Sequence, residues 1–174
     1  MNTGADMRIP VPEAIQRIAA SEDRILAWHF FVFFSRFEYA LKRCDEYLTV
    51  SAQPNWDKFA SDHANQFDNL ESIALKAAVT YIKENPPRKQ LQQAGKLSWS
   101  EPQVYDTREP LLLWLLRMVR CIRNNLFHGG KFPLIPISDP SRDRELLLNS
   151  MYILESCLSL NRKVECQFYK RIGE

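Results

Sequence analysis

Glycine is scarce in this sequence. The chain has five glycines in 174 residues, and only Gly95, Gly129 and Gly130 lie away from its ends. Runs that alternate β-branched and polar residues are almost absent as well, which excludes a protein built mainly from β-sheet. No apolar run approaches the ~20 residues needed to cross a bilayer, and the first residues lack the apolar segment of a signal peptide. We therefore expect no contact with a membrane.

Cysteine is also sparse, and the four residues Cys44, Cys121, Cys157 and Cys166 are scattered along the chain. No two of them form a Cys-x-x-Cys pair, and none stands at zinc-ligand spacing from a histidine. This pattern is typical of reduced, mostly buried thiols in a cytoplasmic protein. We expect neither a metal site nor a cofactor.

The overall composition is that of a folded globular protein. Apolar residues make up 45% of the chain and charged residues 25%, and the length suits one domain over residues 1–174. The formal net charge of +2 is too small to identify a nucleic-acid partner by itself. The distribution of charge is therefore more informative than its sum.

Apolar residues recur at three- and four-residue steps in every long segment. This spacing predicts an all-α fold, a compact up-and-down bundle of about five helices. Prolines at Pro12 and Pro140 suit helix starts, whereas the Asn85–Pro87 segment must stop a helix. The predicted helices are a short one after Pro12, a long one at 22–48, a region at 55–84 broken near 62–65, one from Pro110 to about Gly129, and one from Pro140 onward.

The predicted helix at 22–48 carries more apolar surface than one helix face can bury. Its main stripe comprises Leu26, Phe30, Phe33, Phe37, Leu41, Cys44 and Leu48. Further aromatic residues, Trp28, Phe31, Phe34 and Tyr39, widen that stripe. Such a helix is either central in a bundle or covered by a partner chain. We expect a homodimer in which this helix and the helix after Pro110 lie near the interface.

Two segments do not follow the helical pattern. Residues 88–109 form a long polar stretch, with three lysine or arginine residues among its first nine. Connections of this length are usually functional or mobile. At 163–172 the sequence fits either a short strand, in a hairpin near Val164 to Phe168, or a helical extension.

The segment "RNNLFHGGK", from Arg123 to Lys131, follows the apolar run of the helix after Pro110. No acidic residue lies between Pro110 and Ser138, but Arg117, Arg120, Arg123 and Lys131 do. At 100° per residue, Arg117, Asn124 and His128 share one flank of the helix, with Arg120 beside them. An arginine-rich, carboxylate-free face suits phosphate recognition. An ordinary solvated helix face can look the same, so both interpretations stay open at this point.

Spacing alone does not identify a site, because arginine and histidine stand five residues apart twice in the chain. Arg24 and His29 have the spacing of Arg123 and His128. We expect His29 to be a hydrogen-bonded core or interface residue. The second pair differs in its context: a polar residue directly after the arginine, a helix end, two glycines and no nearby acid.

Arg123, Asn124 and His128 resemble the Arg–polar–x(3)–His signature of the HEPN families. The order of elements around the motif is also similar to that of small stand-alone HEPN proteins. The resemblance implies a helical bundle and a metal-independent endoribonuclease of a toxin–antitoxin, phage-defence or CRISPR setting, with motifs facing each other across a dimer cleft. RNA and an antitoxin protein are then the implied partners. Gly130 stands where one branch of the family has a tyrosine, which argues against regulation through that tyrosine.

The residue types suit RNA cleavage by the RNA's own 2′-hydroxyl group. On this hypothesis His128 is the general base or acid, Arg123 stabilises charge on the phosphorane, and Asn124 orients His128 or the phosphate. Arg117, Arg120 and Lys131 would bind phosphate.

Helix geometry presents one difficulty for this site. A helix places Arg123 and His128 about 140° apart in azimuth and ~7.5 Å apart in rise. The helix must therefore unwind before the glycines, or two subunits must build the site. The alternatives are a non-catalytic helical module that binds RNA, a nucleotide or a partner protein through the basic face, and a motif that only ends a helix.

Overall fold

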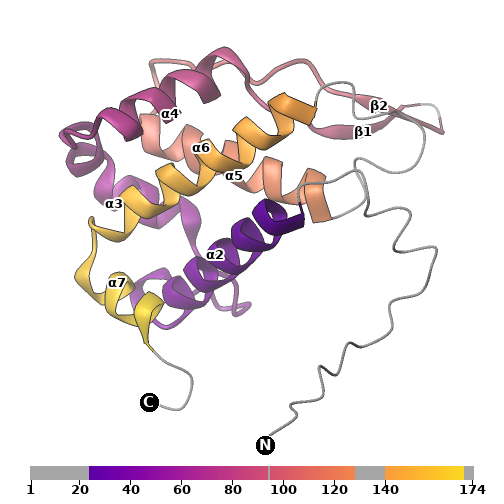
Figure 1. Ribbon diagram of the computed structural model, residues 1–174. Coiled ribbons are helices and arrows are strands. Elements are labelled where there is room, and N and C mark those ends of the chain that lie inside the picture. The colour runs from indigo at the N-terminus through magenta and orange to yellow at the C-terminus, as the bar shows by residue number, and fades with distance from the viewer. Residues whose placement is uncertain (1–23, 94, 128–139, 171–174) are drawn as a thin grey trace, which may run out of the picture.

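The structure is a computed structural model that describes residues 24–93, 95–127 and 140–170. The all-α class is confirmed, because the described part is a helical bundle with one small two-stranded sheet (Figure 1). Its elements are α2 (Arg24–Lys42), η1 (Asp45–Tyr47), α3 (Trp56–Asp68), α4 (Ile73–Glu84), β1 (Gln90–Gln93), β2 (Lys96–Trp99), α5 (Leu111–Phe127), α6 (Pro140–Leu158) and α7 (Arg162–Tyr169). The predicted helix after Pro12 lies outside the described residues.

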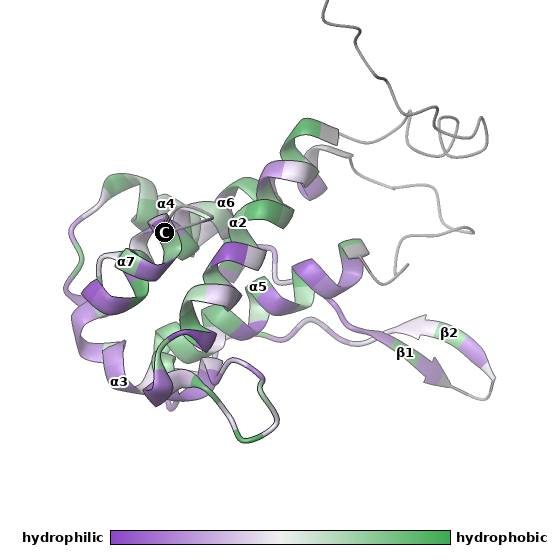
Figure 2. Ribbon diagram, turned by 90° about the horizontal axis from the view of Figure 1, so that it is seen from below, coloured by the Kyte–Doolittle hydropathy of each residue, from purple (hydrophilic) through white to green (hydrophobic). Residues whose placement is uncertain are grey.

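The helices pack in pairs that are distant in sequence. Helix α6 lies against both α2 and α4, α3 lies against α5, and α7 returns to α2. The β1–β2 hairpin projects from this helical body in both views (Figures 1 and 2). Within the described ranges, no helix is long and apolar enough to cross a membrane.

Aromatic side chains join α2 to α3 in the core. The Trp56 ring stacks on Phe34 at 5.3 Å and on Phe37 at 5.4 Å between centroids. Phe59 meets Phe37 edge-on at 5.7 Å. Each such pair contributes roughly 0.5–1.5 kcal/mol beyond the burial of its surface. These contacts fix the α2–α3 part of the bundle.

The predicted apolar stripe of α2 is largely confirmed, but Phe34 takes the place in the core that was expected for Phe33. Phe34 is 3% exposed and belongs to the core, whereas Phe33 is only partly buried and packs on Phe168. The helix also ends at Lys42 rather than at Leu48, because the backbone of Cys44 is extended and a short 3₁₀ turn follows. Leu48 is consequently exposed.

The break between α3 and α4 lies at 69–72 and not near 62–65 as predicted. His63 stays within α3 because its ring is buried and hydrogen-bonded. The new helix begins where the Ser72 hydroxyl accepts from the amide of Leu75 at 3.2 Å, which is an N-cap. The predicted stop at Asn85 is confirmed.

The structure places its hairpin at 90–99 rather than near Val164 to Phe168. Strands β1 and β2 pair antiparallel, with Gln90 opposite Trp99. Gly95 has φ +77°, the left-handed conformation that a tight turn often needs. The 162–169 segment is helix α7, capped by Asn161, whose side chain accepts from two backbone amides. The local alternation at Val164–Phe168 is thus part of a helix.

Candidate functional site

Helix α5 presents its two sides to different surroundings. The predicted apolar face is confirmed: Leu115, Met118 and Val119 are fully buried and Ile122 nearly so, and Leu111 and Leu126 are partly buried. Because the apolar side turns inward, the arginines and asparagines of the helix lie on its remaining flanks.

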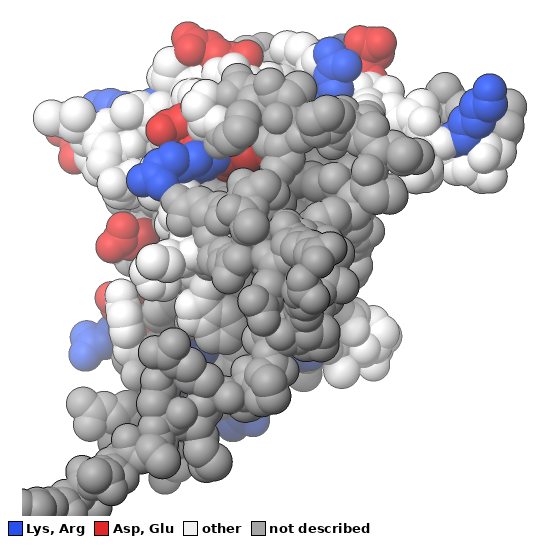
Figure 3. All heavy atoms as spheres, turned by 45° about the vertical axis from the view of Figure 1, so that its right-hand side comes forward, with Lys and Arg blue, Asp and Glu red and all other residues white. Residues whose placement is uncertain are grey.

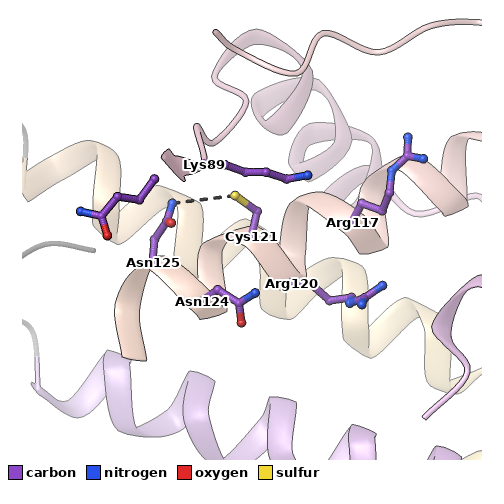
Figure 4. Close-up of a pocket in the computed structure, with 7 residues that line it drawn as sticks. Lys89, Arg117, Arg120, Cys121, Asn124 and Asn125 are labelled. Carbon is purple, nitrogen blue, oxygen red and sulfur yellow. Dashed lines mark hydrogen bonds between the residues drawn. The ribbon is translucent and has the colours of Figure 1, made fainter. Parts of the chain in front are cut away.

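A pocket of about 480 Å³ lies between α5 and the start of the hairpin (Figure 4). Helix α5 contributes Arg117, Arg120, Cys121, Asn124 and Asn125 to its lining, and the hairpin side contributes Lys89 and Gln90. These described lining residues carry three cationic groups, three amides and one thiol, and none of them is a carboxylate. The predicted shared flank of Arg117, Arg120 and Asn124 agrees with this arrangement.

The surroundings of the arginines are not free of acids, contrary to the sequence-based expectation. Arg117 forms an ion pair with Glu109, and Arg120 lies 3.5 Å from a carboxylate oxygen of Asp57. Asp57 comes from α3, which packs on α5. A search of residues 110–138 could not find these partners, because one precedes the helix and the other is brought in by folding.

Arg123 does not line the pocket. Its guanidinium lies 5.6 Å from the centroid of the Phe34 ring of α2. It also donates to the side-chain oxygen of Asn124 at 3.2 Å. Asn124 therefore connects Arg123 to the pocket, with its own NH₂ group still able to donate.

The other predicted site residues, His128 and Lys131, lie beyond the part of the chain that the structure describes. The pairing of Arg123 with His128 is thus an untested hypothesis. The alternative histidine, His29, is exposed on α2, so of its two predicted places, core or interface, the core is wrong and the interface stays a prediction.

Sequence reasoning missed the contribution of the hairpin. The side-chain amide of Asn125 donates to the carbonyl of Arg88 at 2.8 Å, which ties the chain before β1 to α5. Lys89 and Gln90 follow directly and reach the pocket. The available signal was the cluster of basic residues at the start of the 88–109 stretch, but no pattern indicated which helix it would meet.

Cys121 lines the pocket, but its thiol is poorly suited to act as a nucleophile. Burial raises the pKa of its thiol, although nearby Lys89 and the hydrogen bond from Asn125 act in the opposite direction. Cysteine is mostly a neutral thiol at pH 7 even at its ordinary pKa, and the raised pKa reduces the thiolate further. The pocket therefore offers cations and amides for binding, without a protein nucleophile among its described residues.

No group of three or more possible metal ligands occurs among the described residues. Comparison of the chain with family models, curated protein sequences and solved structures found no match.

Proposed function

We propose that this protein is a metal-independent endoribonuclease of the HEPN type, acting as a prokaryotic toxin or phage-defence effector. One observation supports the proposal most: Arg117, Arg120 and Asn124 meet in one pocket, and no carboxylate stands among its described lining residues. In sequence, His128 follows Asn124 by four residues, one helical turn. Cations and amides beside a histidine are the groups that RNA cleavage through its 2′-hydroxyl requires.

In the proposed reaction the 2′-hydroxyl of RNA attacks the adjacent phosphorus in line. His128 removes the hydroxyl proton or protonates the leaving 5′-oxygen, because imidazole titrates near neutral pH. A guanidinium is needed where charge builds on the phosphorane oxygens, and its planar fork suits that geometry. The products are a 2′,3′-cyclic phosphate and a 5′-hydroxyl.

The position of Arg123 outside the pocket lining has to be reconciled with its proposed role on the phosphate. Its contacts with Phe34 and Asn124 hold it at the edge of the pocket, on the side of α2. A composite site resolves this placement: Arg123 of one subunit would serve the phosphate bound at the pocket of the other. Such a site requires the homodimer. The toxin assignment also implies an antitoxin protein as a partner.

The direct test is cleavage of single-stranded RNA in EDTA. We expect His128→Ala to reduce the rate by roughly 10²-fold or more, the usual worth of a positioned acid–base group. His29→Ala is the matched control, because His29 has the same spacing from an arginine but is exposed on α2. Equal loss in both variants, or full activity in His128→Ala, would overturn the assignment.

The second candidate function is a non-catalytic module that binds RNA, a nucleotide or a partner protein. One observation favours it: the described lining supplies groups for binding, whereas Arg123, to which the reaction gives charge stabilisation, does not line the pocket. On the face in Figure 3, moreover, basic and acidic atoms of the described residues are interspersed. RNA binding by a wild-type protein that never cleaves RNA would favour this candidate.

A further inference from the structure

We propose that the pocket between α5 and the start of the hairpin binds one nucleotide of single-stranded RNA, with Lys89 on its phosphate and the amides of Gln90 and Asn124 on its base. This inference deepens the proposed function and rests on it. It gives the hairpin, which carried no role in the sequence-based hypothesis, a part in substrate recognition.

The charges of the lining single out Lys89 as the phosphate ligand. Arg117 is held by Glu109, and Arg120 faces Asp57. Lys89 is exposed and has no acidic partner among the described residues. The Arg120–Asp57 pair is long and exposed on both sides, and such pairs contribute little. Arg120 is therefore a second cation that can exchange its carboxylate for a phosphate, whereas Arg117 is held more firmly.

The backbone at Lys89 is fixed, which makes the site preorganised. The Lys89 amide donates to the hydroxyl of Ser100 at 3.0 Å, and its carbonyl accepts from the Ser100 amide at 2.8 Å. The preceding carbonyl, of Arg88, accepts from Asn125 at 2.8 Å. Three hydrogen bonds thus hold the start of the hairpin against Ser100, which directly follows the second strand, and against α5. A ligand at Lys89 and Gln90 does not have to order this backbone.

The amides of the pocket have hydrogen-bonding groups left for a base. Asn124 uses its oxygen on Arg123, so its NH₂ group remains a donor. Asn125 uses its NH₂ group on Arg88, so its oxygen remains an acceptor. Gln90 makes no side-chain hydrogen bond within the described residues and can offer both. A donor beside an acceptor is the combination that reads the edge of a nucleobase.

The size and shape of the pocket favour a single unit of an unpaired strand. Small-molecule pockets span roughly 300–1,000 Å³, and this one has about 480 Å³. Double-stranded RNA is instead recognised along an extended minor-groove surface, whereas proteins read single strands by taking in splayed bases. None of the described lining residues is aromatic, so base stacking on them would have to use a guanidinium plane.

The test measures binding of fluorescent single-stranded RNA by anisotropy, with His128→Ala in every protein so that cleavage does not interfere. Lys89→Ala should raise Kd about threefold to tenfold and reduce the salt dependence of log Kd by about 0.7, the share of one phosphate contact in a single strand. Lys96→Ala is the matched control, because Lys96 is exposed on the same hairpin and does not line the pocket.

Base recognition is measured with oligomers of A, C, G and U. Gln90→Ala should reduce the ratio between the best and worst oligomer, while Gln92→Ala should not. Gln92 is two residues further along β1, on the same side of the strand, and is exposed. A mononucleotide in competition should bind much more weakly than RNA. Equally tight binding would make a free nucleotide the ligand and overturn the proposal.

The nucleotide pocket and the ribonuclease assignment can each be refuted without refuting the other. If wild-type protein cleaves RNA but Lys89→Ala and Gln90→Ala bind like their controls, the nucleotide pocket is wrong and the ribonuclease stands. If binding depends on Lys89 but wild-type protein leaves RNA intact, the pocket stands and the ribonuclease is wrong. Thermal unfolding of each variant confirms that the exposed substitutions leave the fold intact.

Discussion

At the scale of single residues, one buried hydrogen-bond network connects three parts of the chain. The Tyr47 hydroxyl of η1 lies 3.0 Å from Nε2 of His63 in α3. His63 Nδ1 contacts the side-chain oxygen of Gln66 at 2.7 Å, so Nδ1 carries the hydrogen and Nε2 accepts from the tyrosine. Asn161, the cap of α7, donates to the Tyr47 oxygen at 3.3 Å. These bonds satisfy polar groups that burial would otherwise penalise.

This network makes stability depend on pH in the alkaline range. Burial, helped by the carboxylates of Asp62 and Glu46, raises the pKa of Tyr47 to about 12. The folded protein then holds this proton more tightly than the unfolded chain, whose tyrosine titrates near 10. The stabilisation is full below about pH 10 and is lost as pH rises from about 10 to about 12.

We therefore expect the free energy of unfolding to fall over that range, and to fall less steeply in Tyr47→Phe. Urea unfolding between about pH 9 and pH 12 measures the slope. Tyr169→Phe is the control for removing one phenol hydroxyl, because Tyr169 is exposed. An identical slope in wild type and Tyr47→Phe would contradict the assignment.

At the scale of elements, Arg36 attaches α7 to the bundle. Its guanidinium donates to the carbonyls of Gln167 at 3.2 Å, of Phe168 at 3.1 Å and of Lys170 at 2.7 Å. These carbonyls lie at the end of a helix of eight residues, where they have no partner within the helix. The cation also faces the negative end of the helix dipole. A side chain from α2 thus caps α7.

Removing this cap should loosen α7. We expect Arg36→Ala to lower the free energy of unfolding by roughly 1–3 kcal/mol, the usual worth of hydrogen bonds to a charged group. Hydrogen exchange at 162–169 should accelerate more than elsewhere. Lys42→Ala, an exposed cation on the same helix, should leave exchange at α7 unchanged. Uniform acceleration across the bundle in Arg36→Ala would mean that the residue supports the whole fold instead.

The helices and turns that could be predicted are those that the nearby sequence alone determines. The three- and four-residue spacing on α2 and α5 could be read from the sequence, and so could the stop at Asn85. The break at Asn69–Ser72 could not, because the buried hydrogen bonds of His63 keep α3 intact through 62–65. The hairpin at 90–99 was missed because its strands are short and largely exposed.

The candidate site likewise has one part that the sequence predicts and another part that depends on tertiary packing. The shared flank of Arg117, Arg120 and Asn124 is a property of one helix, and its spacing predicted it. The ion pairs with Glu109 and Asp57, and the approach of Lys89 to the helix, depend on tertiary packing. No reading of residues 110–138 alone could have found them.

At the scale of the whole molecule, helix α2 carries an apolar patch whose side chains are partly exposed. Trp28 is 61% exposed and stacks on Phe31, which is 37% exposed; Ile25 and Val32 are also exposed. Phe34, which the sequence assigned to the surplus, is in the core, so the patch is smaller than predicted. Neighbouring exposed apolar groups of this kind usually mark a contact surface. We assign it to the proposed homodimer.

Trp28→Asp should convert the proposed dimer to a monomer, because it buries a charge in the interface. Sedimentation at micromolar concentration measures the change. Ile73→Asp is the matched control, since Ile73 is 91% exposed on α4. A wild-type protein that sediments only as a monomer would remove the composite-site explanation for Arg123.

In the proposed reaction the RNA's own 2′-hydroxyl is the nucleophile and no metal takes part. The most direct measurement identifies the ends of the products formed in EDTA, from an RNA and from the DNA of the same sequence. We expect RNA fragments that end in 2′,3′-cyclic phosphate, and intact DNA, which lacks the 2′-hydroxyl. Cleavage of the DNA, a requirement for divalent metal, or RNA products ending in a 3′-hydroxyl would contradict it.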